Sequence, residues 1–395
     1  MKKTIVGLFL ILLFLLFGNL TATPPVCAQD TPMGADIRVS QFYSSLQPYG
    51  EWILNDTYGW VWSPYNLPVH WRPYTDGYWV NTDYGWSWVS DQPWGWACFH
   101  YGRWFYDRGH GWLWYPDTVW APAWVAWRTG GEYIGWAPLP PKAIWRASNG
   151  LEFSESDAQG ISWHAYNFCN ARDFTDSDLA GRFIEHARNV TLIGETNITA
   201  NTIMIEDGQV VNRVPFHEMI VRAVGHPIPY FRIARAESPE GHGMFGSELR
   251  VFRPEVKVKD RLVVTVPAKA EPVELMRRHK AEMNSLQVVH QNDQRTLEVE
   301  HNKEMKSPPP GKTKEQLLEQ HKVENNALQE QMQRERELLQ SQHERETRIA
   351  TLSKVPPQHH IVVPAPQVHS NEKTVTKGRQ ASENEKDKDR GKDGR

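Results

Sequence analysis

Tryptophan and glycine recur in a short pattern along the N-terminal half of the chain. A Gly-x-Trp unit is followed six or seven residues later by Gly-Trp-x-Trp, in copies at residues 50–62, 77–88 and 102–114. A degenerate fourth copy lies at 124–136. Trp residues two apart point to one face of a β-strand, and turn-forming residues separate the two halves of each copy. The pattern therefore predicts four β-hairpins within a Trp-rich domain at 42–145.

The next region, residues 147–267, has mixed patterns typical of a small α+β module. Alternating β-branched residues predict strands, and Asp207-Gly208 is a hairpin turn signal. Apolar residues at helical spacing predict a helix over 217–224, which Gly225 ends. The predicted strands are 190–193, 202–205, 210–211, 229–234 and 249–251.

A leucine stripe with a period of 11 residues marks the third region, residues 271–355. His279 and Glu282 recur 42 positions later as His321 and Glu324, so the region is an internal duplication. Three consecutive prolines at 308–310 interrupt it, and no helix continues through them. We expect two long helices, 272–306 and 313–354, forming a helical hairpin or coiled coil. The alternative is a solvated, partly helical linker. The stripe consists of Leu275, Leu286, Leu297, Leu317, Leu328 and Leu339.

Both ends of the chain have the composition of non-globular segments. Lys2 and Lys3 precede an apolar run at 5–17, and the run is followed by Cys27-Ala28. This order predicts a secretory signal peptide at 1–28, cleaved after Ala28, and hence a periplasmic, envelope or extracellular protein. The alternative is an uncleaved N-terminal membrane anchor. The Pro-rich, mixed-charge tail at 356–395 is predicted to be disordered.

The charge and the cysteine content of the chain limit the classes of function that it can have. The chain has 44 Lys and Arg against 47 Asp and Glu, and loss of residues 1–28 removes two of the lysines. This acidic balance argues against nucleic acid as a partner. Cys98 and Cys169 remain after cleavage, either as a disulfide or as two buried apolar side chains. The sequence contains no phosphate-binding glycine loop and no metal-ligand spacing in the Trp-rich domain, so we expect neither cofactor nor metal.

The aromatic residues have two readings. Seventeen of the 18 Trp residues lie within 42–145. Aromatic rings of this kind build cores, but they also stack on sugar rings, and arginines such as Arg72, Arg103 and Arg128 add polar contacts. The candidate surface for an envelope glycan (peptidoglycan or polysaccharide) consists of Trp79, Trp86, Trp88, Tyr101, Arg103, Trp104, Trp112 and Trp114.

Catalysis has weaker support from the sequence. His100 lies near Arg103 and Asp107 and could form an acid–base group of a hydrolase. No Ser, Cys or His falls within a known nucleophile signature. We therefore predict a protein that is not an enzyme, with a hydrolase using His100 as a low-ranked alternative.

Several long motifs resemble a known family. They occur at residues 71–74, 77–80, 84–90, 94–96, 100–104, 120–125 and 135–141. The chain resembles a tryptophan-rich family of exported bacterial proteins of unknown function, the domain of unknown function 6600 type, over about residues 49–141. It departs from that pattern at Cys98 and Phe99. The resemblance implies an envelope location and carries no known activity.

Together these observations predict an exported, non-catalytic cell-envelope protein with a structural or interaction role. Glycan binding by the aromatic surface is the first alternative. We expect residues 271–355 to mediate self-association or to bind a protein partner.

Overall fold

The computed structural model describes residues 42–199, 203–254, 261–263, 272–352 and 362–364. The predicted signal peptide lies outside them, as does the predicted disordered tail except for β19 (Val362–Pro364), which pairs antiparallel with β18 (Arg261–Val263). None of the described helices combines the length and the apolar character that crossing a bilayer demands.

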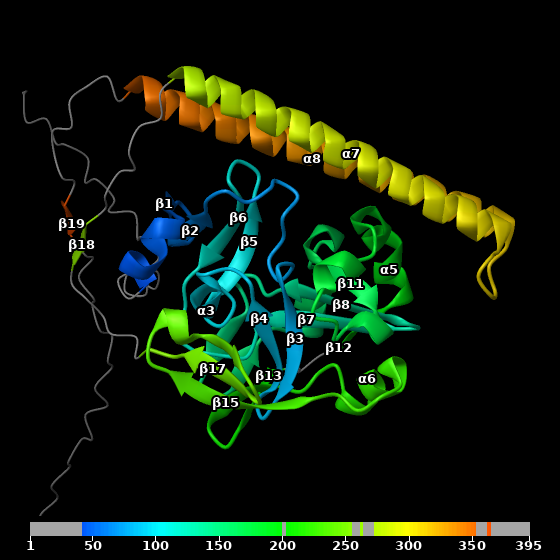
Figure 1. Ribbon diagram of the computed structural model, residues 1–395, viewed down its shortest axis with the longest axis horizontal. Helices are drawn as coiled ribbons and strands as arrows, with labels where there is room; N and C mark the ends of the chain where they lie inside the picture. Colours follow the sequence, from blue (N-terminus) through cyan, green and yellow to red (C-terminus); the bar gives the residue numbers. More distant parts are fainter. Residues whose placement is uncertain (1–41, 200–202, 255–260, 264–271, 353–361, 365–395) are drawn as a thin grey trace, which may run out of the picture. The chain divides into compact units, whose positions relative to one another are not determined.

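The predicted fold class is confirmed: a mainly β part rich in Trp precedes a pair of long helices (Figure 1). Each of the four sequence copies forms an antiparallel hairpin. We call the β-rich part, residues 42–254, the body. Its hairpins are β1 (Gly50–Asn55) with β2 (Gly59–Pro64), β3 (Gly77–Thr82) with β4 (Gly85–Ser90), β5 (Arg103–Asp107) with β6 (Gly111–Tyr115), and β7 (Val125–Gly130) with β8 (Tyr133–Pro138).

Every hairpin places one Trp directly opposite another. This holds for the degenerate fourth copy as well as for the three regular ones. Cross-strand aromatic pairs stabilise a sheet beyond their buried area, and directly opposed side chains lie closest to each other. The last Trp of each copy therefore has a Trp partner on the facing strand. The opposed pairs are Trp52 with Trp62, Trp79 with Trp88, Trp104 with Trp114, and Trp127 with Trp136.

The glycine of Gly-x-Trp makes room for the indole of the facing strand. A Cβ atom added at Gly50 would lie 2.4 Å from the ring of Trp62 and 2.3 Å from the carbonyl oxygen of Ser63. At Gly102 an added Cβ would lie 2.7 Å from Nε1 of Trp114. Because Gly50 has extended backbone, with φ −174°, its requirement is steric and not conformational. The spacing of the repeat thus places the Trp ring of one strand against the glycine at the start of the facing strand.

Strands from the second region complete the sheets that the hairpins begin. β14 (Gln209–Asn212) pairs in parallel with β4, and β15 (Tyr230–Ala236) pairs in parallel with β3. The resulting seven-stranded sheet has the order β13-β14-β4-β3-β15-β17-β16. The two four-stranded sheets have the orders β1-β2-β6-β5 and β11-β8-β7-β12. The additional strands are β11 (Asn167–Asn170), β12 (Asn197–Thr199), β13 (Ile203–Glu206), β16 (Gly243–Phe245) and β17 (Glu248–Phe252).

Short elements connect these sheets. The loop after the helix α3 (Gly95–Cys98) lies at the centre of the core. The indoles of Trp114 and Trp124 donate to the carbonyl oxygens of Tyr101 and His100 in this loop, and that of Trp104 donates to the carbonyl oxygen of Cys98 at the end of α3, at 2.8 to 3.0 Å. The remaining short elements are β9 (Ile144–Arg146), β10 (Gly150–Glu152), α4 (Glu155–Gln159), η1 (Gln47–Tyr49), η2 (Trp163–Ala165), η3 (Ala171–Asp173), η4 (Leu179–Arg182), η5 (His186–Arg188) and η6 (Pro239–Gly241).

One predicted strand is wrong. Residues 190–193 belong to the helix α5 (Asn189–Glu195), although Val, Thr and Ile favour strands. The helix buries Leu192 against Tyr166 and Phe168 of the body, and this tertiary packing outweighs local propensity. The other elements predicted for this region are present, including α6 (His217–Val224), which ends at left-handed Gly225.

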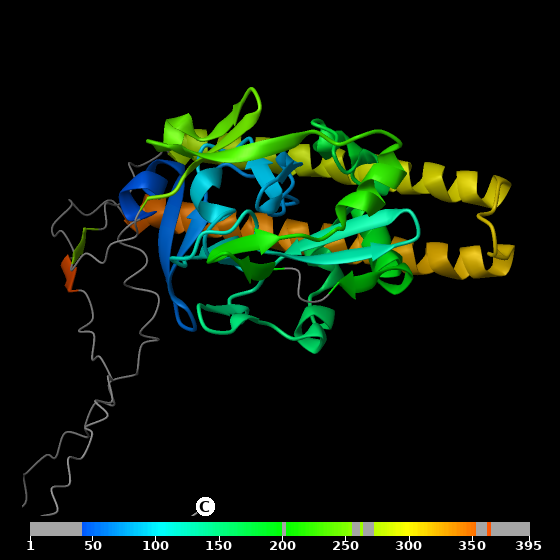
Figure 2. The ribbon, with the colours of Figure 1, turned by 90° about the horizontal axis from the view of Figure 1, so that it is seen from below.

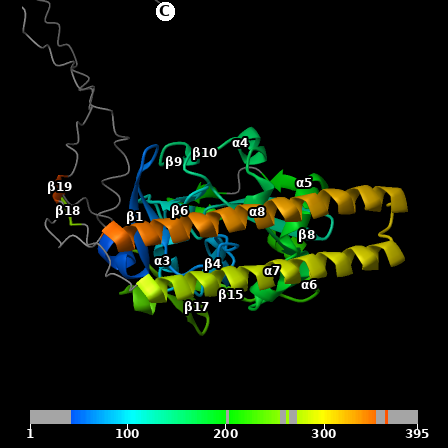
Figure 3. The same ribbon diagram turned by 90° about the horizontal axis from the view of Figure 1, so that it is seen from above.

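Two long antiparallel helices follow the body. They are α7 (Pro272–Lys306) and α8 (Lys314–Leu352), and Figures 2 and 3 show them running side by side. Their ends lie within two residues of the predicted ones, because the prolines at 308–310 fix the turn. All six leucines of the 11-residue stripe are buried. We call this pair of helices the helical hairpin.

Replacing Gly50 tests the steric role of glycine in the repeat. Gly50→Ala forces a methyl group into the ring of Trp62, so we expect it to lower the free energy of unfolding by about 1–3 kcal/mol. Gly194→Ala is the control, because an added Cβ there meets nothing within 4 Å. Urea unfolding followed by Trp fluorescence measures both. Equal stability of the two variants would contradict the steric role.

Candidate functional site

The structure places the predicted glycan-binding residues mainly inside the body. Seven of the eight are buried, with at most 2% of their surface exposed. Trp112 alone among them is partly exposed. Arg103 is also engaged: its guanidinium stacks on Trp124 at 3.6 Å and donates to the carbonyl oxygen of Ala143 at 2.9 Å. These residues therefore form core and not a surface.

His100 is buried as well. Its Nδ1 lies 2.9 Å from the carbonyl oxygen of Ala121, and its ring stacks on Trp120. Burial, together with the neighbouring His242, lowers the pKa of His100 to about 3. Asp107, proposed from the sequence to act with it, bonds to His110 in the β5–β6 turn. The structure therefore does not bring His100 and Asp107 together as an acid–base pair.

Both cysteines are buried and free. The disulfide hypothesised from the sequence is absent, and the alternative of two packed apolar side chains describes them. Burial raises the pKa of both thiols, that of Cys98 and that of Cys169. Neither is therefore a thiolate at neutral pH.

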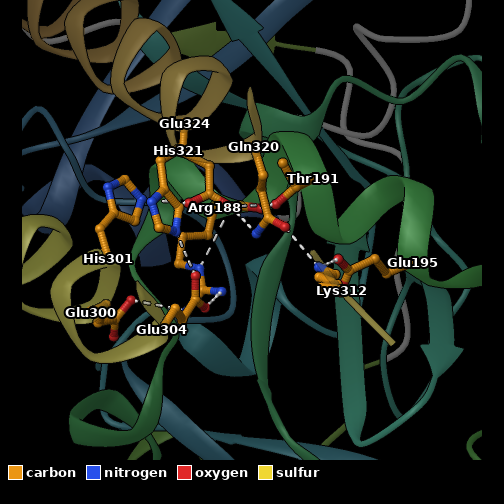
Figure 4. A network of polar contacts seen from close by, with 10 residues as sticks. All are labelled: Arg188, Thr191, Glu195, Glu300, His301, Glu304, Lys312, Gln320, His321 and Glu324. Atoms are coloured by element: carbon orange, nitrogen blue, oxygen red, sulfur yellow. Dashed lines mark hydrogen bonds and ion pairs between the residues drawn. The ribbon is translucent and has the colours of Figure 1, made fainter. Parts of the chain in front are cut away.

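A charged network joins the helical hairpin to the body (Figure 4). Its centre is Arg188, in the 3₁₀ turn before α5. The guanidinium lies 2.6 Å from Glu304 and 3.1 Å from Glu300 on α7, and 3.7 Å from Glu324 on α8. Burial lowers the pKa of Arg188, but the three carboxylates outweigh it and raise that pKa above its ordinary value. Thr191 adds a hydrogen bond to Glu324 at 2.7 Å.

Within the hairpin, histidines of one helix bind carboxylates of the other. The pairs are reciprocal: His301 binds Glu324 at 2.7 Å, and His321 binds Glu304 at 2.8 Å. The rings of His301 and His321 stack with their centroids 3.8 Å apart. The same arrangement recurs near the other end, where His279 and His343 stack and bind Glu346 and Glu282, and His290 binds Glu335 between them. The 42-residue duplication relates the two ends of the hairpin. The pair His343–Glu282 corresponds to the pair His301–Glu324, and His279–Glu346 corresponds to His321–Glu304.

A pocket of about 90 Å³ lies where the body meets α8; we call it the junction pocket. Polar groups from both parts line it, together with aromatic rings. Arg72, one of the three arginines that the sequence suggested could add polar contacts, is among them. The lining consists of Val69, His70, Trp71, Arg72, Tyr106, Trp112, Ser162, His164, Ala165, His186, Gln331, Arg334 and Glu335.

Burial shifts the pKa values of several groups around this pocket. Arg72 remains a cation, although burial lowers its pKa to about 10. Burial and then the charge of Arg334 lower the pKa of His164 to about 4. Desolvation and the nearby Asp293 raise the pKa of Glu185 to about 7, and desolvation and Glu335 raise that of Asp293 to about 6. At neutral pH the imidazole of His164 is therefore neutral, Glu185 is only partly ionised, and Asp293 is mostly ionised.

Sequence reasoning missed most of these residues. Arg188, His164 and His186 lie in the second region, where no pattern singled them out. The histidines and glutamates of the hairpin were visible as a repeat, but their pairing depends on the antiparallel register. Among the described residues, no group of three or more His, Cys, Asp or Glu side chains is arranged to hold a metal ion.

Comparison with known proteins adds one match. Residues 43–143 match the model of a family of unknown function (DUF6600). The resemblance predicted from the sequence is thereby confirmed over this segment. The matched residues 43–143 contain the four Trp hairpins and most of the aromatic rings of the core. The helices α7 and α8 lie outside the match. No curated protein and no solved structure matches the chain.

The raised pKa of Glu185 predicts a pH-dependent effect. An acid whose pKa is raised by folding stabilises the fold below its unfolded pKa, and this contribution is lost as the pH rises towards 7. Gln resembles the protonated acid. We therefore expect Glu185→Gln to raise the melting temperature at pH 8 and to leave it nearly unchanged at pH 4.5. Glu344→Gln, at an exposed position on α8, is the control. A pH-independent difference would contradict the assignment.

Glu324 tests the charged network. Its carboxylate is fully buried and bonds to His301 and Thr191, close to Arg188. Glu324→Gln removes one of the three carboxylates around Arg188. We expect it to lower the free energy of unfolding by an amount on the order of 3 kcal/mol. Faster hydrogen exchange in α7 and α8 would accompany it. Glu319→Gln, whose side chain is 70% exposed, should change neither. Unchanged exchange in Glu324→Gln would show that the network does not hold the hairpin in place.

Proposed function

We propose that this protein is exported and acts in the cell envelope as a non-catalytic structural or interaction protein. The observation that carries the proposal is how the polar side chains are used. Histidines and glutamates bind each other across the helical hairpin, and Arg188 ties that hairpin to the body through three carboxylates. Such contacts hold the helical hairpin to the body. Because these polar side chains bind one another, their role is structural.

Export is supported by the sequence. The segment 1–28 has the order of a charged, an apolar and a small-residue part that signal peptides share. The stacked rings and indole hydrogen bonds of the body do not depend on a disulfide, so the fold can form with both cysteines reduced.

The helical hairpin is the proposed interaction element. Its two helices present exposed apolar side chains among charged ones, including Met276, Val288 and Val299 on α7. Val288 and Val299 are 11 positions apart, and so they lie on one face of the helix. We propose that this face contacts a second copy in a coiled-coil arrangement, or another envelope protein.

Glycan binding is a second candidate because of Trp112. It is the partly exposed member of the predicted set, and it lines the junction pocket. No observation favours the hydrolase alternative, since His100 is buried without an acidic partner.

Expression of the full chain in a bacterial host, followed by cell fractionation, tests the proposal. We expect the protein in the periplasmic or envelope fraction with Gln29 as its first residue, as determined by mass spectrometry. A variant lacking residues 1–28 is the control and should remain in the cytoplasm. An intact N-terminus in the membrane fraction would favour the anchor instead of cleavage, and an intact chain in the cytoplasm would contradict export.

Sedimentation velocity of the same purified protein tests the interaction role. A monomer–dimer equilibrium that weakens in Val288→Glu/Val299→Glu would support self-association. A monomer at every concentration would exclude a second copy as the partner and leave another protein.

A further inference from the structure

The junction pocket contains two arginines without a carboxylate partner. Neither Arg72 nor Arg334 forms an ion pair with any residue in the part of the chain that the structure describes. Arg72 donates instead to neutral acceptors, Oδ1 of Asn167 at 2.8 Å and the carbonyl oxygen of His70 at 3.3 Å. The guanidinium carbon of Arg334 lies 4.9 Å from the ring centre of Tyr106. A cation withdrawn from water is costly unless an anion compensates it.

The neighbouring acids that the structure describes form no ion pair with either arginine. Glu335, Glu185 and Asp293 act on Arg72 through space and oppose the lowering of its pKa by burial, but burial remains the larger effect. Glu335 also lines the pocket, but its carboxylate accepts from Nε2 of His290 at 2.8 Å and from Gln331 at 3.0 Å. Glu330 bonds to His164 at the rim, at 3.3 Å. The positive charge that faces the pocket is therefore not neutralised by direct contacts.

We propose that the junction pocket binds a small organic carboxylate carried on a ring, with Arg72 and Arg334 binding the carboxylate and Trp112 forming the apolar wall. Guanidinium groups match carboxylates in planar, two-point geometry. The volume of about 90 Å³ accommodates the acid group and the part of the ring next to it. Trp71, Trp112 and Tyr106 offer the flat apolar surface on which a sugar ring packs.

The electrostatics agree with an anionic ligand. Burial is the main cause that lowers the pKa of His164 and of His186. The charge of Arg334 and then that of Arg72 lower the pKa of His164 further, and Arg72 also lowers the pKa of His186. The two imidazoles thus lie in the positive field of the arginines and stay neutral at pH 7. They add no charge to the pocket, and their ring nitrogens are already engaged: Nε2 of His164 lies 3.3 Å from Glu330, and the two ring nitrogens of His186 lie 2.9 Å from Oε1 of Gln331 and 3.1 Å from the carbonyl oxygen of His164. Because the lining comes from the body and from α8, a bound ligand would also fasten the helical hairpin.

Calorimetric titration of the full mature chain with three probes tests the proposal. Glucuronate has the ring and the carboxylate, glucose has the same ring without the acid, and inorganic phosphate is an oxyanion without a ring. We expect glucuronate to bind and to raise the melting temperature, and we expect no binding of glucose. Binding of phosphate as tight as that of glucuronate would overturn the proposed ring-bound carboxylate, and so would the absence of glucuronate binding.

Variants locate the site. Arg334 is partly exposed, so Arg334→Gln should fold, and we expect it to weaken glucuronate binding about tenfold or more. Arg336→Gln, two positions away and exposed outside the pocket, is the matched control and should bind as wild type does. Trp112→Ala should weaken glucuronate without creating affinity for glucose. Equal binding by Arg334→Gln and Arg336→Gln would overturn the assignment to this pocket. This result is independent of export, so the proposed function and the site can fail separately.

Discussion

The body depends on a Trp ring lying across a glycine of the facing strand. In each of the regular hairpins an indole occupies the space that a side chain at the glycine would need, as Gly50 and Trp62 illustrate. The opposed Trp pairs then bring large apolar area to one face of every hairpin. Two strands alone are marginal in water, so the hairpins must share this face to become stable. Their packing produces a core made largely of aromatic rings.

At several positions the indole N–H group gives Trp a role that Phe could not fill, although the N–H groups of Trp52, Trp62, Trp79, Trp88 and Trp120 are buried without a hydrogen-bond partner. Three indoles donate to carbonyl oxygens at the end of α3 and in the loop after it, those of Cys98, His100 and Tyr101. The indole of Trp86 donates to the carbonyl oxygen of Pro215 at 2.6 Å. Buried loop carbonyls would otherwise lack a donor, at a cost comparable to a lost hydrogen bond. Trp therefore lets irregular backbone pass through the core. It also links the second region to the first, because Trp127 donates to Asn212.

The helical hairpin attaches by different chemistry. A small apolar patch joins it to the body, with Ala187 and Trp163 packed against Leu297 and Leu328. Around this patch the contacts are charged, centred on Arg188. Buried charges contribute little net stability when paired, but a missing partner is costly, so they select one docking position. The junction pocket lies along the same contact, where the charges of Arg72 and Arg334 are not matched.

Local sequence signals determined the elements of this protein. The Gly-Trp repeat predicted all four hairpins, and the prolines at 308–310 with the 11-residue leucine period predicted both long helices, because turns and periodicity act over a few residues. Only the tertiary structure decided that α5 is a helix and that rings such as Trp88 lie inside. The same holds for the neighbours of Arg72, whose partner Asn167 is 95 positions away. Whether a side chain is buried, and which charge it pairs with, depends on contacts between segments that are far apart in the sequence. Patterns over a few neighbouring residues do not reveal those contacts.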